Sequence, residues 1–238
     1  MTELHATSSL SWLETLPPVG VELVAMPVAA APAVTLFPEE LELVGDAVAK
    51  RRHEFATGRE CARRALARFG LPPAPLLRTA GGGVQWPAGY TGSVTHSDAV
   101  AAAAVGAVAG VPGLGLDVEE LGRLRDALLK RILTPAELTV LQAVPEADRQ
   151  LLATRAFCAK EALFKCLQPL LNHWFGFQEA EVLLGVGVPE RTEADGDQLA
   201  IRLGPGLTDL MPAGWRLAAR CASGDGLVAA IVWVETVS

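Results

Sequence analysis

The stretch that decides the fold is Phe157-Cys158-Ala159-Lys160-Glu161-Ala162-Leu163-Phe164-Lys165, in the middle of a predicted helix. Apolar residues recur through this region at helical spacing, and the stripe, which we expect Pro169 to end, consists of Leu152, Ala156, Ala159, Leu163 and Cys166. At about 100° per residue, Glu161 lies opposite the middle of this stripe, with Lys165 one turn further on. The sequence therefore predicts a helix with one apolar and one charged face.

Two phenylalanines flank the charged face of this helix. A plain surface helix would leave Phe157 and Phe164 in water, whereas a helix that lines a cleft between two halves of the molecule would cover them. The alternative reading of Glu161 and Lys165 is an exposed ion pair, which contributes about 0.3 to 0.5 kcal/mol to helix stability. Phe157 and Phe164 therefore favour a helix that lines a cleft over a helix with an exposed ion pair.

Outward from this helix, helical patterns alternate with strand-like ones. A helix is predicted from Pro38, with an apolar stripe of Leu41, Val44, Val48 and Phe55 that includes Arg51. Thr57 and Glu60 fit a capping box, so a break near Thr57 and a second helix to Phe69 are expected. Strand-like runs follow each helical region, at 76–79, 92–96, 100–108 and 114–118, and then at 181–186, 199–203, 215–221 and 227–234.

The order of helix and then strands thus occurs twice, although no residue-level repeat is visible. It predicts an α+β fold of two similar halves in one chain, residues 1–112 and 113–238, which meet near Val111-Pro112-Gly113. The charged, Gly-containing segment 191–198 is expected to form an exposed loop between strands.

Composition limits the classes of function. Half of the 238 residues are apolar, no apolar run is long enough for a membrane span, and the N-terminus has no secretory pattern, so a cytoplasmic, globular protein is expected. The net charge of −7 argues against nucleic-acid binding. The four cysteines lack the spacing of a zinc site or a disulfide framework and predict reduced, mostly buried thiols.

A second acidic motif, Gly115-Leu116-Asp117-Val118-Glu119, lies at the end of a strand-like run. Asp117 and Glu119 are two residues apart, so both carboxylates point to one side and would repel each other without a cation. A solvated strand end is the simpler explanation of such a pair. With Glu161 as a third ligand, however, the acids would suit Mg²⁺ beside a substrate phosphate.

Three basic residues upstream are candidates for binding an anion. Arg51 lies on the predicted apolar stripe, and Arg59 lies in the first turn of a predicted helix, where positive charge is unfavourable. A bound phosphate would reverse that cost, although arginines at the edge of a core would also fit. His96 closes the run Gly92-Ser93-Val94-Thr95-His96-Ser97 and, taken alone, fits a structural role as well as a binding one.

Together these segments resemble the signature motifs of the 4′-phosphopantetheinyl transferases. The two acidic motifs, 115–119 and 157–165, carry the resemblance, and the segments 51–59 and 92–97 are similar to the upstream blocks of the enterobactin-synthase-component and actinobacterial type. Trp174-Phe175-Gly176-Phe177 extends the match. The family fold implied is two α/β halves related by a pseudo-two-fold axis, with the active site at their interface.

The resemblance implies an enzyme that transfers the 4′-phosphopantetheine arm of coenzyme A to a serine of an apo acyl or peptidyl carrier protein, releasing adenosine 3′,5′-bisphosphate. It implies that Mg²⁺ is held by Asp117, Glu119 and Glu161, and that Glu161 also takes the serine proton. Lys160 and Lys165 would bind phosphate oxygens. The nucleotide end of coenzyme A would be held by Arg51, Arg59, Thr95 and His96.

The chain departs from the family pattern in one segment. Relatives carry a Lys or Arg in the Gly-rich turn before Trp-Pro, where this chain reads Thr79-Ala80-Gly81-Gly82-Gly83-Val84-Gln85-Trp86-Pro87. Backbone N–H groups of the three glycines or the side chain of Arg78 could replace that contact.

The expected partner is an acyl or peptidyl carrier protein of polyketide or nonribosomal-peptide biosynthesis, bound by a monomer. The candidate docking surface is the basic and apolar segment Leu121–Ile132, which would equally suit a helix packed on the core. A metal-dependent pyrophosphohydrolase acting on coenzyme A or a nucleotide, and a non-catalytic coenzyme A-binding module, are the alternative functions.

Overall fold

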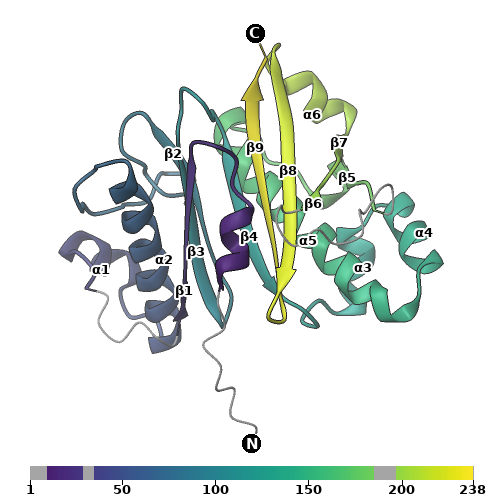
Figure 1. Cartoon of the computed structure of the whole chain (residues 1–238), viewed down its shortest axis with the longest axis horizontal. Helices are drawn as coiled ribbons and strands as arrows, with labels where there is room; N and C mark the ends of the chain where they lie inside the picture. The colour runs from purple at the N-terminus through teal and green to yellow at the C-terminus, as the bar shows by residue number, and fades with distance from the viewer. Residues whose placement is uncertain (1–9, 29–34, 185–196, 238) are drawn as a thin grey trace, which may run out of the picture.

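The computed structural model describes residues 10–28, 35–184 and 197–237 (Figure 1). The elements before the chain midpoint are η1 (Leu10–Thr15), β1 (Val21–Pro27), α1 (Pro38–Val44), α2 (Ala49–Arg68), β2 (Tyr90–His96) and β3 (Val100–Ala107). Those after it are β4 (Leu114–Glu120), α3 (Asp126–Ile132), α4 (Pro135–Ala143), α5 (Glu146–Leu171), η3 (Phe177–Glu179), β5 (Ala180–Val182), β6 (Asp197–Gln198), β7 (Ile201–Leu203), α6 (Pro205–Leu210), β8 (Trp215–Gly224) and β9 (Leu227–Thr236).

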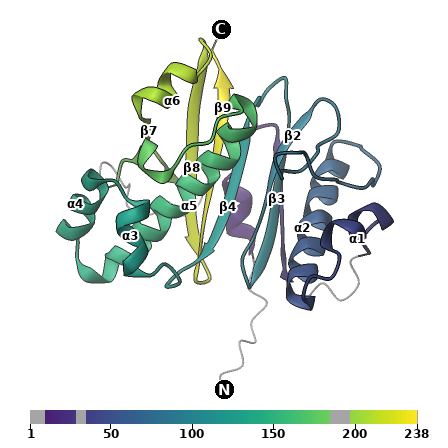
Figure 2. The same cartoon turned by 180° about the vertical axis from the view of Figure 1, so that it is seen from behind.

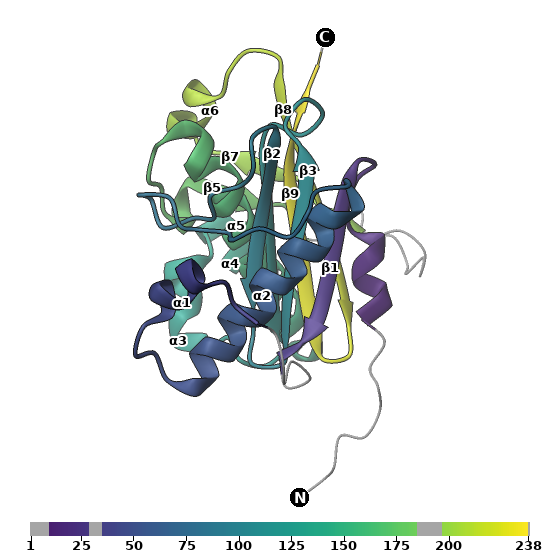
Figure 3. The ribbon, with the colours of Figure 1, turned by 90° about the vertical axis from the view of Figure 1, so that its left-hand side faces the viewer.

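Two sheets of the same internal order form the centre of the molecule. The first has the order β1-β3-β2 and the second β4-β9-β8-β6, and β5 pairs with β7 beside them. For each large sheet the chain runs through a first strand, then a long helix and then a hairpin of two strands. The first strand pairs antiparallel with the second strand of that hairpin. Figure 3 shows α2 crossing the first sheet, and Figure 2 shows α5 in front of the second. The predicted α+β class and the twice-repeated order are confirmed.

The predicted helix break near Thr57 is wrong. The Thr57 hydroxyl donates to the carbonyl oxygen of His53 at 2.7 Å within a continuous α2, so Thr57 does not cap a new helix. The chain breaks earlier, at Gly45, where a φ of 44° ends α1. The predicted apolar stripe is also wrong, because Leu41 is 54% and Val48 73% exposed. The buried face of α2 lies further along the helix.

The other differences lie at the ends of elements. Residues 76–79 form no strand apart from a single bridge between Arg78 and Val84. Helix α5 continues past Pro169 and ends at Asn172, whose φ of 47° is left-handed. Strand β5 stops at Val182, although a strand was predicted to 186; residues 185–186 lie outside the described chain.

The predicted loop 191–198 is tested only at its end. Residues 191–196 lie outside the described residues, whereas Asp197 and Gln198 form β6, which pairs with Cys221 and Arg220 of β8. This part of the loop prediction is therefore wrong.

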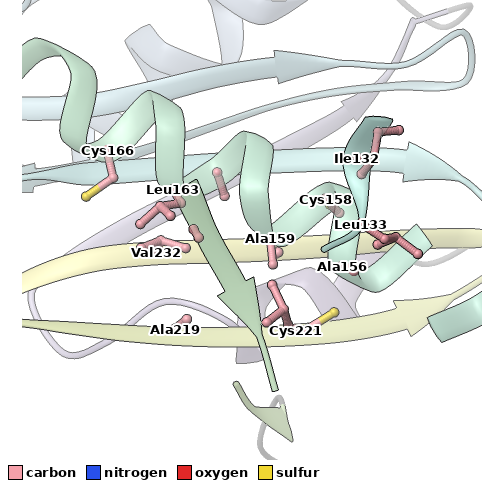
Figure 4. Packing of buried hydrophobic residues seen from close by; sticks show 14 of the residues in the cluster. Ile132, Leu133, Ala156, Cys158, Ala159, Leu163, Cys166, Ala219, Cys221 and Val232 are labelled. Atoms are coloured by element: carbon pink, nitrogen blue, oxygen red, sulfur yellow. The ribbon is translucent and has the colours of Figure 1, made fainter. Parts of the chain in front are cut away.

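Helix α5 packs directly on the backbone of β4. Of its predicted stripe residues, Ala156, Ala159, Leu163 and Cys166 are buried, as Figure 4 shows, and Leu152 is half-buried. A Cβ at Gly115 of β4 would collide with the carbonyl oxygen of Ala162 and lie 2.7 Å from the Cys166 nitrogen. Only glycine allows this close approach. It brings the charged turn of α5 next to the acidic end of β4.

The short helix η1 joins the two sheets on the face opposite α5 (Figures 1 and 2). Leu13 and Leu16 are fully buried in one core cluster with residues of both sheets, including Leu23 of β1, Leu116 of β4 and Ile231 of β9. The two sheets therefore share a hydrophobic core.

All four cysteines are reduced and buried, as the sequence predicted. Burial raises the pKa of the Cys61 thiol to about 12, and it also raises that of Cys158 and Cys166.

No helix within the described chain has the length and apolar character needed to cross a membrane.

Candidate functional site

The candidate site lies where β2 of the first sheet meets β4 of the second. These strands belong to different sheets but lie side by side (Figure 2). The Ser93 hydroxyl of β2 donates to the carbonyl oxygen of Leu116 at 3.4 Å, and the Thr95 hydroxyl donates to Asp117 Oδ1 at 3.0 Å. Side chains of β2 thus hold the acidic end of β4.

Lys165 of α5 completes this contact. Its ammonium donates to Asp117 Oδ1 at 2.6 Å, to the Thr95 hydroxyl at 3.2 Å and to the Leu116 carbonyl oxygen at 3.2 Å. Burial alone would lower the pKa of Lys165, but the carboxylates of Asp117 and Glu161 outweigh it and raise the pKa. Lys165 is therefore a charged group fixed against Asp117.

The three predicted acids influence one another. Burial, and then the charge of Asp117, raises the pKa of Glu119 to about 7, with Glu161 adding to the effect. Burial and Asp117 also raise the pKa of Glu161. Asp117 Oδ2 is buried and has no hydrogen-bond partner among the described residues. The site thus concentrates negative charge where one carboxylate oxygen lacks a donor.

The acids do not form a closed ligand set in this arrangement. Within residues 10–28, 35–184 and 197–237, no group of three or more His, Cys, Asp or Glu side chains is gathered closely enough to hold a metal ion. The Lys165 ammonium lies against Asp117 Oδ1 and neutralises part of the charge of this carboxylate. Asp117 contributes to the raised pKa of both Glu119 and Glu161, so the three acids lie close enough to influence one another, and their binding of one metal ion stays a prediction.

A pocket of about 600 Å³ opens beside Lys165. It is lined by residues of α2, the Gly-rich turn, β2 and the end of α5, together with Leu114 of β4. Its charged and aromatic lining includes Arg51, Glu54, Phe55, Arg59, Arg78, Trp86, His96, Phe164 and Lys165. The predicted anion-binding residues Arg51, Arg59 and His96 thus share one pocket with Lys165. Thr95 does not line it but lies behind, between Lys165 and Asp117.

Arg51 and His96 are linked through Glu54, which the sequence analysis did not select. Arg51 Nη1 hydrogen-bonds to His96 Nε2, and the Glu54 carboxylate lies 3.5 Å from both Arg51 Nη1 and His96 Nδ1. Burial lowers the pKa of His96 against the opposing effect of Glu54. Only the spacing of Glu54, one turn after Arg51, could have indicated this role.

Arg59 is a buried cation with unused hydrogen-bonding capacity. It is 5% exposed, its guanidinium stacks 4.4 Å from the centre of the Phe55 ring, and its Nε has no hydrogen-bond partner in the described part of the chain. Burial lowers its pKa to about 10. Arg78 stacks on the same ring at 5.8 Å, so a cation next to the Gly-rich turn does line the pocket.

The structure places Lys160 elsewhere, which corrects the sequence expectation. Lys160 is 2% exposed, and its ammonium donates to Glu137 Oε2 at 2.7 Å and to the carbonyl oxygens of Ile132 and Phe177. All three of its donors are used, and it does not line the pocket. We therefore leave Lys160 out of the candidate site.

The two phenylalanines beside the charged face of α5 are both half-buried. Phe164 packs against Phe175 with ring centres 5.2 Å apart and lines the pocket. Phe157 instead packs against Phe177 at 5.8 Å, away from the pocket lining. The expectation that a cleft covers them is confirmed for Phe164 only.

Two family models match consecutive parts of the chain. Residues 39–106 match the 4′-phosphopantetheinyl transferase N-terminal domain, and residues 113–218 match the 4′-phosphopantetheinyl transferase superfamily. The first covers α2 and β2 of the pocket, and the second covers β4 and α5.

Curated relatives agree with these models. The chain is 34% identical over 200 residues to the 4′-phosphopantetheinyl transferase Npt of Nocardia iowensis, covering 83% of this chain and 87% of that protein. It is 42% identical to PptT of Mycobacterium tuberculosis and 44% identical to Svp of Streptomyces mobaraensis, both over 63% of this chain. Those two matches span 66% and 62% of the relatives, which is less than two thirds of their length.

Proposed function

Because the chain belongs to the 4′-phosphopantetheinyl transferase superfamily, we propose that it transfers the 4′-phosphopantetheine arm of coenzyme A to a serine of an apo acyl or peptidyl carrier protein. The observation that carries the proposal is the pocket, which is lined by Arg51 and Arg59 of one family segment and by Lys165 of the other, and Lys165 is paired with Asp117. In this proposal residues 1–112 and 113–238 form two pseudo-symmetric halves with the active site between them.

The nucleotide end of coenzyme A is assigned to the arginine side of the pocket. Arg51, Arg59 and His96 would contact its phosphates, as the family resemblance implies, and Arg78 adds a fourth basic group. The unpartnered Nε of Arg59 supports this assignment, since a buried donor without an acceptor is costly until an anion binds it. The pyrophosphate would then lie toward Lys165.

Asp117, Glu119 and Glu161 would hold Mg²⁺ beside Lys165, which lines the pocket, although none of the three acids is itself a lining residue. Their carboxylate oxygens are the ligands that this hard cation prefers, and the buried Oδ2 of Asp117 lacks a donor. Burial and then the charge of Asp117 raise the pKa of Glu119, and a bound cation would relieve both effects. Bound Mg²⁺ supplies charge stabilisation to the pyrophosphate oxygens.

The reacting nucleophile belongs to the carrier protein. Its serine oxygen forms a bond to the phosphorus that bears the pantetheine arm, and the bond from that phosphorus to adenosine 3′,5′-bisphosphate breaks. In the proposal Glu161 accepts the serine proton, and burial, which raises the pKa of this carboxylate, makes it a stronger base. Lys165 stabilises negative charge on the departing bisphosphate.

The carrier protein is proposed to dock beside α3 on a monomeric enzyme. Leu121 and Leu128 are 43% and 39% exposed there, next to Arg123 and Arg125. Leu124 and Ile132 of the same segment are buried and serve the core, so only part of the predicted docking segment is available. An acidic carrier surface would complement the exposed part.

Intact-mass spectrometry tests the function. An apo carrier protein incubated with this protein, coenzyme A and Mg²⁺ should gain the mass of one phosphopantetheine arm, and chelation of Mg²⁺ should abolish the gain. Release of adenosine 3′,5′-bisphosphate from coenzyme A without a carrier would instead indicate a pyrophosphohydrolase. Binding of coenzyme A with no chemistry, unaffected by Glu161→Ala, would indicate a non-catalytic module.

A further inference from the structure

Glu40 of α1 is a fully buried carboxylate with an unusual set of partners. Its Oε1 accepts from Arg63 Nη1 and from the backbone N–H of Leu76, both at 2.9 Å. Its Oε2 accepts from the backbone N–H of Phe37 at 3.0 Å and from Arg63 Nη1 at 2.9 Å. One side chain thus ties together the start of α1, the middle of α2 and the segment that leads to the Gly-rich turn.

The second half of the chain repeats this arrangement. Glu137 of α4 accepts from the backbone N–H of Thr134, from Lys160 Nζ and from the backbone N–H of Val182. Both glutamates follow a proline by two residues in the segments Phe37-Pro38-Glu39-Glu40-Leu41 and Thr134-Pro135-Ala136-Glu137-Leu138. The basic partner follows by 23 positions in both cases. The two glutamates are therefore equivalent, and Glu137 is a natural control for Glu40.

The two glutamates differ in what lies next to them. Arg59 Nε is 4.0 Å from Glu40 Oε1, and Glu40 is the group that opposes the lowering of the Arg59 pKa by burial. From Leu76 the chain continues directly to the pocket lining at Arg78–Val84. By contrast, Lys160 and Val182, which bind Glu137, do not line the pocket.

We propose that Glu40 is a positioning residue for coenzyme A, acting through Arg59 and the Gly-rich turn, whereas Glu137 only holds its own half together. This inference rests on the proposed function. Glu40 hydrogen-bonds to Arg63, stays 4.0 Å from the Arg59 Nε and leaves that Nε without a hydrogen bond, while its bond to Leu76 fixes the start of the turn. Arg59 and the turn are thereby held in place before the ligand binds.

Calorimetric titration of coenzyme A into the full chain tests the proposal. Glu40→Asp keeps the charge but shortens the side chain, so that it cannot reach Arg63 and Leu76 together, and Glu40→Gln keeps the length but loses the charge. Both variants should raise the Kd for coenzyme A about tenfold, the size expected for one misplaced charged hydrogen bond. In the transfer assay, the KM for coenzyme A should rise with kcat close to that of the wild type.

Glu137→Asp is the matched control. It should lower the Tm as much as Glu40→Asp does and leave the Kd for coenzyme A within about twofold of the wild type, since its partners lie away from the pocket. Titrating each variant at the same interval below its own Tm separates binding from unfolding.

Four outcomes would overturn the proposal. Unchanged binding by folded Glu40 variants would make Glu40 purely structural, and tighter binding would mean that it only offsets the arginine charge. Equal weakening by Glu137→Asp would mean that general loosening of the fold causes the effect. If the wild-type protein itself fails to bind coenzyme A, the proposed function fails and this inference fails with it.

Discussion

In α2 the segment Cys61-Ala62-Arg63-Arg64-Ala65-Leu66-Ala67-Arg68 follows the same pattern as Cys158-Ala159-Lys160-Glu161-Ala162-Leu163-Phe164-Lys165 in α5. Each segment begins with a cysteine whose thiol donates to the carbonyl oxygen of the second residue of a hairpin strand. Cys61 donates to Ala101 of β3, and Cys158 donates to Val228 of β9. The two helices therefore occupy equivalent places. Glu161, however, is replaced by Arg64 in the first half.

The strands under these helices differ in the same way. Val24 of β1 pairs with Ala103, the fourth residue of β3, and Asp117 of β4 pairs with Ala230, the fourth residue of β9. Met26 likewise corresponds to Glu119. The first half thus has apolar residues where the second has acids. In the proposed function, the same architecture binds the nucleotide in the first half of the chain and provides the acids and the metal site in the second half.

The largest expected effect is at Glu161, where the two halves of the chain differ in charge. Glu161→Gln should lower kcat for phosphopantetheine transfer by about 10² to 10⁴, because the proposed general base is lost. Arg64→Gln, at the equivalent position, should leave kcat within about twofold, since Arg64 is exposed and pairs only with Glu60 among the described residues. Intact-mass rate measurements on both variants decide the matter, and similar rates for the two would remove Glu161 from the mechanism.

The next effect compares the two buried ion pairs. Lys160→Met should destabilise the protein by about 3 to 5 kcal/mol, because it leaves Glu137 buried without a cation. Arg63→Met should cost less, since Arg59 remains 4.0 Å from Glu40. Urea unfolding of both variants measures the difference, and a larger loss for Arg63→Met would contradict it.

Packing of the two long helices gives a third test. Gly115→Ala should cost about 3 kcal/mol, because the added Cβ would collide with the backbone of α5. The equivalent residue of β1 is Glu22, which carries a full side chain and pairs with Arg68 at 2.9 Å. Glu22→Ala should change the free energy of unfolding by no more than about 0.5 kcal/mol. Thermal and urea unfolding check both values.

The smallest effect concerns the docking surface. Arg125→Glu should raise the KM for the carrier protein about three- to tenfold and leave the KM for coenzyme A unchanged, because a surface charge acts mainly on encounter with an acidic partner. Arg202→Glu, an exposed residue paired with Glu181 on β5, is the control. Equal effects on both KM values, or on both variants, would exclude this surface as the docking site.

The sequence alone was sufficient for the elements that obey simple periodicity. The buried stripe of α5 and the acids at the end of β4 were found because a helix repeat and a two-residue strand spacing leave direct traces. The twofold order of elements was visible, but the residue-level repeat was missed, since Arg64 and Glu161 differ in charge and the matching positions are few.

Other features depend on contacts between distant segments. Glu40 read as an ordinary acid in the first turn of a helix, and its bonds to Arg63 and Leu76 exist only after folding. Lys160 lies next to Glu161 in the sequence but on another side of α5, where Glu137 holds it. The capping pattern at Thr57 was misleading because the hydroxyl can bond back to His53 inside a continuous helix.

The buried thiols have a practical consequence. A thiol must ionise and meet solvent before an alkylating reagent can attack it, and burial prevents both for Cys61, Cys158 and Cys166. The rate of alkylation therefore measures local opening of the fold. Labelling of Cys61 reports the exposure of α2, and labelling of Cys158 reports the exposure of α5. The two halves of the molecule can thus be timed separately without adding a probe.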